Sequence, residues 1–372
     1  MTSTERFLAS LVCSSRLTPN SNYEANRVRR VKRLSLPILR TYLFVAMGCC
    51  ALSPRVATAQ SMWLSRDEVA ALSTHTPAWA QLRTAADADI PKPDLSDQDE
   101  STNVHVLAKA LVFARTGETK YRDAVVGNCT EAMGTEEKGR TLALGRKLAA
   151  YVIAADLVGF RDEKFLDWLR VVRQRNLGGR SLITTHCDRP NNWGAHCGAS
   201  RIAVAVFLND REDLERAAAV FRGWLGNRAS YSRFKFDRDL SWQVDPLNPV
   251  PLNPQGAMKD GHSIDGSLPE DMRRGGPFAW PPRRTEYPWG ALNGAVLQAE
   301  LLTRQGYPAW QWEDDALLRA VRYLHGLGWQ PDAEHQWMLY LVNRRYQAKF
   351  PVPPKVAAGK NMAWTNWTHP AP

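Results

Sequence analysis

Residues 191–226 read NNWGAHCGASRIAVAVFLN followed directly by DREDLERAAAVFRGWLG, and this stretch decides the fold class. In both halves, Ala, Val, Leu and Ile recur every three to four residues, which predicts two amphipathic helices. Asp188 or Asn191 is placed to cap the first helix, and Pro190 suits its first turn. The short polar connection around Asn209 predicts that the two helices run antiparallel.

The same pattern recurs along most of the chain, while the alternation typical of strands is nearly absent. Three more helix pairs are predicted, at 103–117 with 119–133, 140–160 with 161–175, and 287–306 with 313–328. A Ser65–Glu68 capping box marks an earlier helix start. Because the pairs share no repeat consensus, a TPR-type array is disfavoured. We therefore expect an all-α protein, with its helix pairs closed into an incomplete (α/α) toroid.

The helical pattern stops between residues 226 and 286. This stretch contains DPLNPVPLNPQG at 245–256 and GGPFAWPPRR at 275–284, which are too rich in Pro and Gly for a helix. Loops of this length in compact domains are usually functional or disordered. Its aromatic residues and arginines predict an ordered lid or cleft wall.

The first 59 residues resemble an export signal. A basic segment at 27–40 precedes an apolar run at 41–52, and Ala57 and Ala59 form a small-residue cleavage pattern. The apolar run is too short for a membrane span. We expect residues 60–372 to be one periplasmic or secreted domain, with no stable membrane span after cleavage.

The charge and the cysteine content bear on nucleic-acid binding and on disulfide formation. The chain holds 48 Lys/Arg and 38 Asp/Glu, a net charge of +10, but residues 1–59 account for +7 of it. The remaining +3 gives no indication of nucleic-acid binding. Cys129, Cys187 and Cys197 remain after cleavage. One disulfide and one free thiol are the simplest expectation in an oxidising compartment, with the pairing open.

The segment THCDRPNNWGAHCG at 185–198 concentrates hydrogen-bonding side chains at the start of a predicted helix. Asn192 and His196 are four residues apart and therefore share a helix face. A carboxamide and an imidazole there can donate hydrogen bonds to a carboxylate, assisted by the helix N-terminus. The alternative is structural: Asn192 caps the helix and His196 belongs to the core.

A later segment, DGSLPEDMRRGGPFAWPPRRTEYPWGALNGAVLQAELL at 265–302, supplies the context. The order Asp-Gly-x-Leu-Pro, Arg274-Gly275 and then Tyr287 opening a helix, after Asn191-Asn192, resembles the alginate-lyase-like family of polysaccharide lyases. The tail YLVNRRYQAKFPV at 340–352 is also similar to the end of that family's domain. The resemblance spans roughly residues 103–351 through scattered motifs, and it implies an α/α toroid that cleaves uronate polymers.

The sequence departs from the family pattern in two places. Trp193 stands where a His follows the Asn, so His196, His186 or His262 is needed to supply the imidazole. Arg274 is about a dozen residues from Tyr287, which leaves Arg283 and Arg284 as rival arginines. Asn191, Trp193 and Trp280 complete the candidate substrate-binding residues.

The resemblance implies β-elimination. Removal of the weakly acidic C5 proton of a uronate places negative charge on its carboxylate, which Asn192, His196 and Arg274 are candidates to neutralise. A tyrosine near arginines can act as the base, and the phenol so formed can protonate the leaving oxygen. Tyr287 is the candidate for both roles.

Two other functions compete with the lyase. A glycoside hydrolase on a similar barrel would use two carboxylates, with Asp265, Glu270 and Glu286 as candidates. A non-catalytic glycan-binding or scaffold protein is favoured if Trp193 abolishes the site. The sequence shows no metal-binding motif, and no cofactor is expected. An acidic polysaccharide is the expected partner.

Overall fold

The computed structural model describes residues 61–370, so the predicted export segment lies outside the described residues. Helices account for 54% of the structure and the only named strands of the described residues form one short hairpin, which confirms the all-α expectation. The α-helices are α1 (Arg66–Ala71), α2 (Pro77–Asp87), α3 (Thr102–Thr116), α4 (Thr119–Ala132), α5 (Thr141–Leu157), α6 (Glu163–Val172), α7 (Leu182–Asp188), α8 (Asn192–Phe207), α9 (Arg211–Trp224), α10 (Pro269–Met272), α11 (Tyr287–Arg304), α12 (Trp312–Gly326), α13 (Trp337–Tyr346) and α14 (Thr365–Thr368). Strands β1 (Met258–Lys259) and β2 (His262–Ser263) pair antiparallel, and two 3-10 turns are η1 (Arg273–Gly275) and η2 (Ala333–His335).

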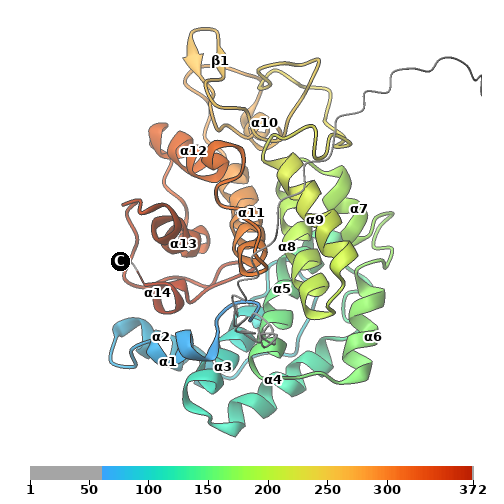
Figure 1. Cartoon of the computed structure of the whole chain (residues 1–372), viewed down its shortest axis with the longest axis vertical. Helices are drawn as coiled ribbons and strands as arrows, with labels where there is room; N and C mark the ends of the chain where they lie inside the picture. Colours follow the sequence, from blue (N-terminus) through green and yellow to red (C-terminus); the bar gives the residue numbers. More distant parts are fainter. Residues whose placement is uncertain (1–60, 371–372) are drawn as a thin grey trace, which may run out of the picture. The chain divides into compact units, whose positions relative to one another are not determined.

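Four helices form a row through the interior. Helix α3 packs on α5, α5 on α8, and α8 on α11, while α4, α7 and α9 pack on the outside of this row (Figure 1). Nearly every residue of α5, α8 and α11 is buried, which explains why these three helices carry apolar residues on all sides, with a few buried polar residues among them.

Two glycines let the inner helices approach closely. A Cβ on Gly145 of α5 would lie 2.9 Å from the backbone nitrogen of Cys197 on α8. A Cβ on Gly294 of α11 would overlap the backbone of Ala195, also on α8. Alanine at either position would therefore force the helices apart.

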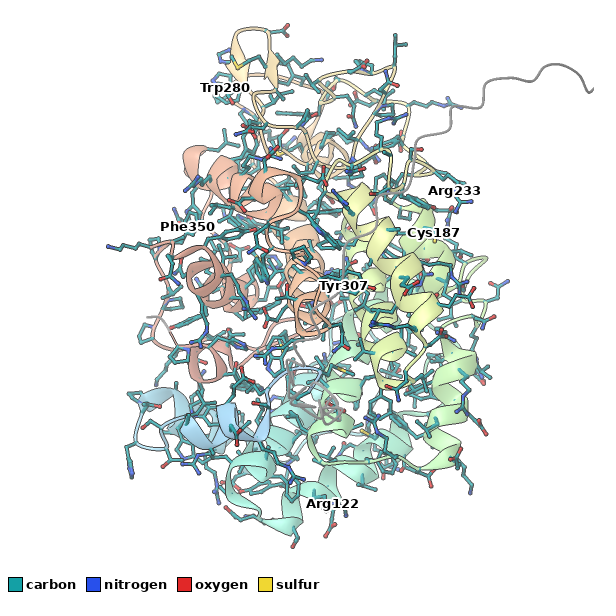
Figure 2. All side chains as sticks on the ribbon, in the orientation of Figure 1. Arg122, Cys187, Arg233, Trp280, Tyr307 and Phe350 are labelled. Carbon is teal, nitrogen blue, oxygen red and sulfur yellow. The ribbon has the colours of Figure 1, made fainter. Side chains whose placement is uncertain are left out.

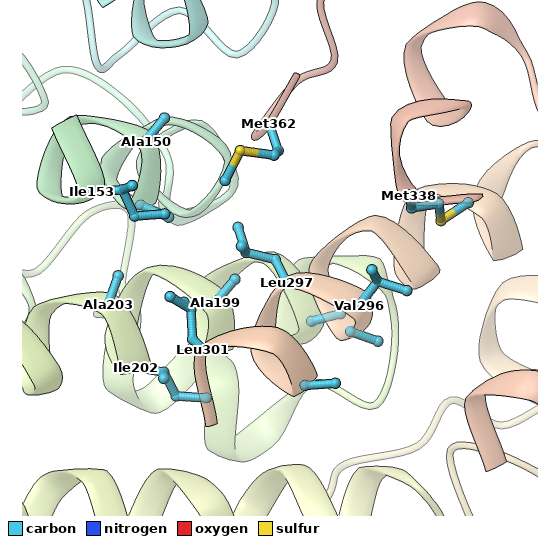
Figure 3. Close-up of a cluster of buried hydrophobic side chains, with 14 of the residues drawn as sticks. Ala150, Ile153, Ala199, Ile202, Ala203, Val296, Leu297, Leu301, Met338 and Met362 are labelled. Carbon is cyan, nitrogen blue, oxygen red and sulfur yellow. The ribbon is translucent and has the colours of Figure 1, made fainter. Parts of the chain in front are cut away.

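The hydrophobic core fills the space between these helices. Figure 3 shows Ile153 of α5, Ile202 of α8, and Leu297 and Leu301 of α11 pointing into one cluster, with Met362 of the C-terminal segment beside them. All five side chains are fully buried. The core therefore joins segments that are about two hundred residues apart in the sequence, such as those of Ile153 and Met362.

The helix boundaries follow local sequence signals. Ser65 and Glu68 form the predicted capping box, and Gly117 ends α3 in the left-handed conformation with φ of 75°. The predicted helix at 313–328 differs at its start, because Glu313, Asp314 and Asp315 adopt φ of 54° to 56°. Its regular part therefore begins at Ala316.

Residues 226–286 contain only the β1–β2 hairpin, α10 and η1, and they are fastened to one another by buried side chains. The Trp242 indole N–H donates to the Gly276 carbonyl at 3.0 Å, and the same ring meets Phe278 edge to face at 4.9 Å. Asn253 Nδ2 donates to the Trp242 carbonyl at 2.9 Å and to Ser267 Oγ at 2.8 Å. These contacts order a segment that has little regular structure.

The C-terminal segment is bonded to the first helices. Trp364 Nε1 donates to the Val104 carbonyl at 2.8 Å, and Asn103 Nδ2 donates to the Lys360 carbonyl at 3.1 Å. Gln81 Nε2 donates to the Val356 carbonyl at 2.7 Å. Residues at the two ends of the described chain therefore belong to one packed unit.

The expected disulfide is wrong for the described residues. Cys129, Cys187 and Cys197 are all free thiols. Cys197 donates its S–H to the Thr141 carbonyl at 3.3 Å, and Cys129 faces the Tyr151 carbonyl at 3.8 Å. Helix packing thus separates the thiols and gives two of them backbone partners.

Candidate active site

The two adjacent asparagines at the start of α8 have different surroundings. Asn191 is the N-cap, and its side chain accepts a hydrogen bond from the Trp193 backbone N–H at 3.2 Å. Asn192 is buried, and its backbone N–H donates to Asp271 Oδ1 at 3.2 Å. Its carboxamide has no hydrogen-bond partner among residues 61–370, and its Nδ2 faces Gly290 of α11. The Asn192 side chain is thus free to bind a ligand.

Pro190 was expected in the first turn of this helix. It instead lies outside α8, because the N-cap is Asn191 and the helix begins at Asn192. Pro190 precedes the cap and uses its carbonyl to accept the Trp224 indole N–H at 3.1 Å. The half-buried Trp193 follows, with the Arg189 guanidinium 5.9 Å from its ring centroid. An aromatic ring therefore stands where the resemblance implies an imidazole.

Tyr287 opens α11 and meets one arginine of the 265–302 segment. Arg274 Nη2 donates to the Tyr287 hydroxyl oxygen at 3.0 Å, and its guanidinium lies 4.4 Å from the centroid of the ring. The phenol is 39% exposed, so a substrate can reach its oxygen. The Arg274 guanidinium therefore fixes the position of the phenol oxygen.

The two rival arginines have other contacts. Arg284 forms ion pairs with Glu286 at 2.8 Å and Asp332 at 3.3 Å. The exposed Arg283 packs its carbonyl against Gly275. Of the three candidate arginines, Arg274 is the one that the structure brings to Tyr287.

His196 lies one turn after Asn192, and it is buried. Its Nδ1 has no hydrogen-bond partner. Burial, with the positive charge of Arg146 nearby, lowers the pKa of His196 well below the usual 6.5. The imidazole is therefore neutral near pH 7, so it can donate one N–H but contributes no positive charge to the site.

Sequence reasoning missed four residues of this region. The charges of Arg146 and Lys147 of α5 and of His335 of η2 also lower the pKa of His196, and Asn293 of α11 contacts His335. Asn293 Nδ2 lies 2.6 Å from His335 Nδ1, and burial lowers the pKa of His335 to about 4. The sequence does hold one indication of this site, because Arg146 and Lys147 interrupt the otherwise mostly apolar helix TLALGRKLAAYVIAADL.

Neither of the other candidate histidines joins this group. His186 lies on α7, where it is buried with Nδ1 3.4 Å from Arg201 Nη1. Burial lowers the pKa of His186 well below 6.5, and the nearby Arg201 adds to this effect. His262 lies on β2 and stacks on Trp280, with centroids 4.5 Å apart and planes at 11°.

Trp280 is 41% exposed and borders a pocket of about 430 Å³. Arg319, Arg322 and Tyr323 of α12 line the same pocket. An exposed indole with a guanidinium beside it is a surface suited to a sugar ring that carries an acidic group. None of the residues that line this pocket belongs to the Asn192–Tyr287 group. Trp280 and the stacked His262 therefore form a separate region.

The three carboxylates of the hydrolase alternative are each paired with a different arginine. Asp265 pairs with Arg319, Glu270 with Arg273 at 2.9 Å, and Glu286 with Arg284 at 2.8 Å. A hydrolase needs one of its two carboxyl groups protonated, whereas an arginine partner stabilises the ionised form. This arrangement does not favour the hydrolase.

Residues 61–370 contain no group of three or more His, Cys, Asp or Glu side chains arranged to hold a metal ion. Within the same range, none of the helices is both long enough and apolar enough to cross a membrane. No protein-family model matches the sequence, and no curated protein matches it.

Proposed function

We propose that the protein is a polysaccharide lyase that cleaves a uronate-containing polymer by β-elimination. The observation that carries this proposal is the placement of three groups: the Arg274–Tyr287 pair at the start of α11 and the free Asn192 carboxamide at the start of α8. Asn192 faces Gly290, which is three residues after Tyr287 and so lies on the same face of α11.

The reaction follows from these groups. Tyr287, as the phenolate held by Arg274, takes the C5 proton, and the electrons of the C–H bond form the C4–C5 double bond as the bond from C4 to O4 breaks. The phenol then gives its proton to the departing oxygen. Asn192 hydrogen-bonds the carboxylate while charge accumulates on it. The products are a chain that begins with a 4,5-unsaturated uronate and a chain with a new reducing end.

An incomplete (α/α) toroid is part of this proposal. The row α3–α5–α8–α11 supports it, as do the hydrogen bonds from Trp364 and Asn103 that link the C-terminal segment to α3. Within this arrangement, residues 226–286 would form the wall of the cleft that carries Arg274. The basic-then-apolar segment before Ala59 supports a periplasmic or secreted location.

The test is incubation of the purified protein with polymannuronate, polyguluronate and glucuronan. A lyase generates the ultraviolet absorbance of a 4,5-unsaturated uronate together with new reducing ends. New reducing ends without that absorbance would instead indicate a hydrolase. Binding of a polymer with neither product would indicate the non-catalytic glycan-binding alternative.

A further inference from the structure

The two basic residues in the middle of α5 are placed unusually for charged side chains. Lys147 is fully buried, and the side chain of Arg146 is 15% exposed. Fourteen of the seventeen residues of α5 are buried, and most of these fourteen are apolar. Lysine and arginine are rarely buried without close partners.

Their ion pairs are too long for hydrogen bonds. Arg146 Nη1 is 3.9 Å from Asp99 Oδ1, and Lys147 Nζ is 3.9 Å from Glu100 Oε1. Asp99 is mostly exposed and already accepts a hydrogen bond from Lys360 Nζ at 2.8 Å. Arg146 Nε and Lys147 Nζ are buried atoms with no hydrogen-bond partner. Buried polar atoms in proteins are generally hydrogen-bonded, so these donors await a ligand or water.

Other polar atoms are also buried without partners, on α8, on α11 and in the C-terminal segment. His196 Nδ1, Asn293 Oδ1 and Asn361 Oδ1 are buried without partners. Ion pairs link Arg146 to His335: Asp99 lies 3.9 Å from Arg146 and 2.8 Å from Lys360, and Glu334 lies 3.4 Å from Lys360 and 3.7 Å from His335. Burial lowers the pKa of Arg146, and the charges of Glu334, Asp99 and Tyr287 oppose this effect. The free donors of α5 therefore lie beside the residues of the candidate active site.

The charge balance of the site identifies the ligand. His196 and His335 are neutral, because burial lowers the pKa of both. Arg274 is engaged with the Tyr287 oxygen. A uronate carboxylate next to Tyr287 still needs a cation, and Arg146 is a guanidinium whose buried Nε–H has no partner among residues 61–370. A guanidinium fork matches the two oxygens of a carboxylate.

We propose that Arg146, with Lys147 behind it, binds the carboxylate of the uronate whose C5 proton Tyr287 removes. This inference rests on the proposed lyase function. In it, Arg146 supplies the positive charge that an imidazole at position 193 would otherwise bring, while Arg274 serves the phenol. The ligand class is a sugar acid, and a neutral sugar would leave the Arg146 guanidinium unpaired.

The experiment measures binding of oligomannuronate, oligoguluronate and oligoglucuronate, each compared with the same oligosaccharide after carboxyl reduction, by calorimetry. The variants are Arg146→Gln, which removes the charge, and Arg146→Lys, which keeps it. Arg122→Gln is the matched control, because Arg122 is exposed on α4 and pairs only loosely with Asp123 at 3.7 Å (Figure 2). Thermal unfolding of each variant establishes that it is folded.

Wild-type protein and Arg122→Gln should prefer the acidic form of one oligosaccharide. Arg146→Gln should weaken binding of that form on the order of tenfold to a hundredfold, as for the loss of one charge-assisted hydrogen bond. It should leave binding of the reduced form unchanged, and Arg146→Lys should retain part of the preference. If Arg146→Gln does not fold, loss of preference in Arg146→Lys relative to Arg122→Gln serves as the test.

An unchanged preference in Arg146→Gln overturns the inference, as does a wild-type protein that binds no acidic oligosaccharide. The two proposals remain distinguishable. An Arg146-dependent preference without any unsaturated product supports the carboxylate subsite and rejects the lyase. An unsaturated product formed equally well by Arg146→Gln supports the lyase and rejects the subsite.

Discussion

Replacing Tyr287 with phenylalanine removes the one atom that the proposed mechanism cannot lose. The hydroxyl oxygen accepts a hydrogen bond from Arg274 Nη2 at 3.0 Å, and both side chains are exposed enough to stay hydrated. An exposed hydrogen bond to a charged group contributes little, so the free energy of unfolding should fall by less than about 1 kcal/mol. The ring itself keeps its packing against the Arg274 guanidinium.

The effect on turnover should be large. A positioned acid or base contributes about 10²–10⁴-fold to a rate, and in this mechanism Tyr287 fills both roles. We therefore expect the rate of ultraviolet product formation by Tyr287→Phe to drop at least about a thousandfold. Binding of the polymer should survive, because Asn192 and the basic residues are unchanged.

Tyr307→Phe is the matched control. Tyr307, labelled in Figure 2, follows the C-terminal end of α11. Tyr287 is the first residue of that helix, so the two phenols lie at its opposite ends. Tyr307→Phe should leave turnover at the wild-type level. If Tyr287→Phe retains more than a few per cent of the activity of Tyr307→Phe, Tyr287 is not the base.

Three further predictions test the site and the packing. Asn192→Ala should lower kcat by about a hundredfold or more, because one hydrogen-bond donor to the developing negative charge is lost. Asn191→Ala should instead lower the free energy of unfolding, measured by chemical denaturation, by about 1 kcal/mol, because α8 loses its N-cap. Gly294→Ala should lower the free energy of unfolding by about 1–3 kcal/mol, because its methyl group would overlap the Ala195 backbone, and an unchanged denaturation midpoint would contradict this packing. Burial lowers the pKa of Lys147 from 10.5 to about 8, so the unfolded chain binds more protons between these values and wild-type stability rises with pH there. The free energy of unfolding of Lys147→Met should therefore exceed that of wild type by the largest amount below pH 8. In urea titrations this difference should shrink by about 2–4 kcal/mol towards pH 10.5.

Much of the secondary structure was predictable because its causes are local. The capping box of Ser65 and Glu68, the left-handed Gly117 and the three-to-four-residue spacing of apolar side chains act within one or two turns of a helix. The short α7 was missed because seven residues are too few to show a period. The irregular start of α12 was not predicted, because the spacing of apolar residues carries no information on the positive φ angle of Glu313.

The candidate site was predictable only where its residues fall in an ordered motif. Asn192, Arg274 and Tyr287 were named from the sequence, and the structure places Arg274 against Tyr287. The choice of Arg274 over Arg284 depended on the pairing of Arg284 with Glu286 and Asp332, which no spacing reveals.

The sequence by itself determined where the helices lie and which segment cannot be helical, since both depend on neighbours along the chain. Only the tertiary structure decided which charges share a site. Arg146 and His335 are almost two hundred residues apart, and the ion pairs of Asp99, Lys360 and Glu334 link them. The same packing keeps the thiols apart and makes the imidazole of His196 neutral, because burial depends on the whole fold rather than on adjacent residues.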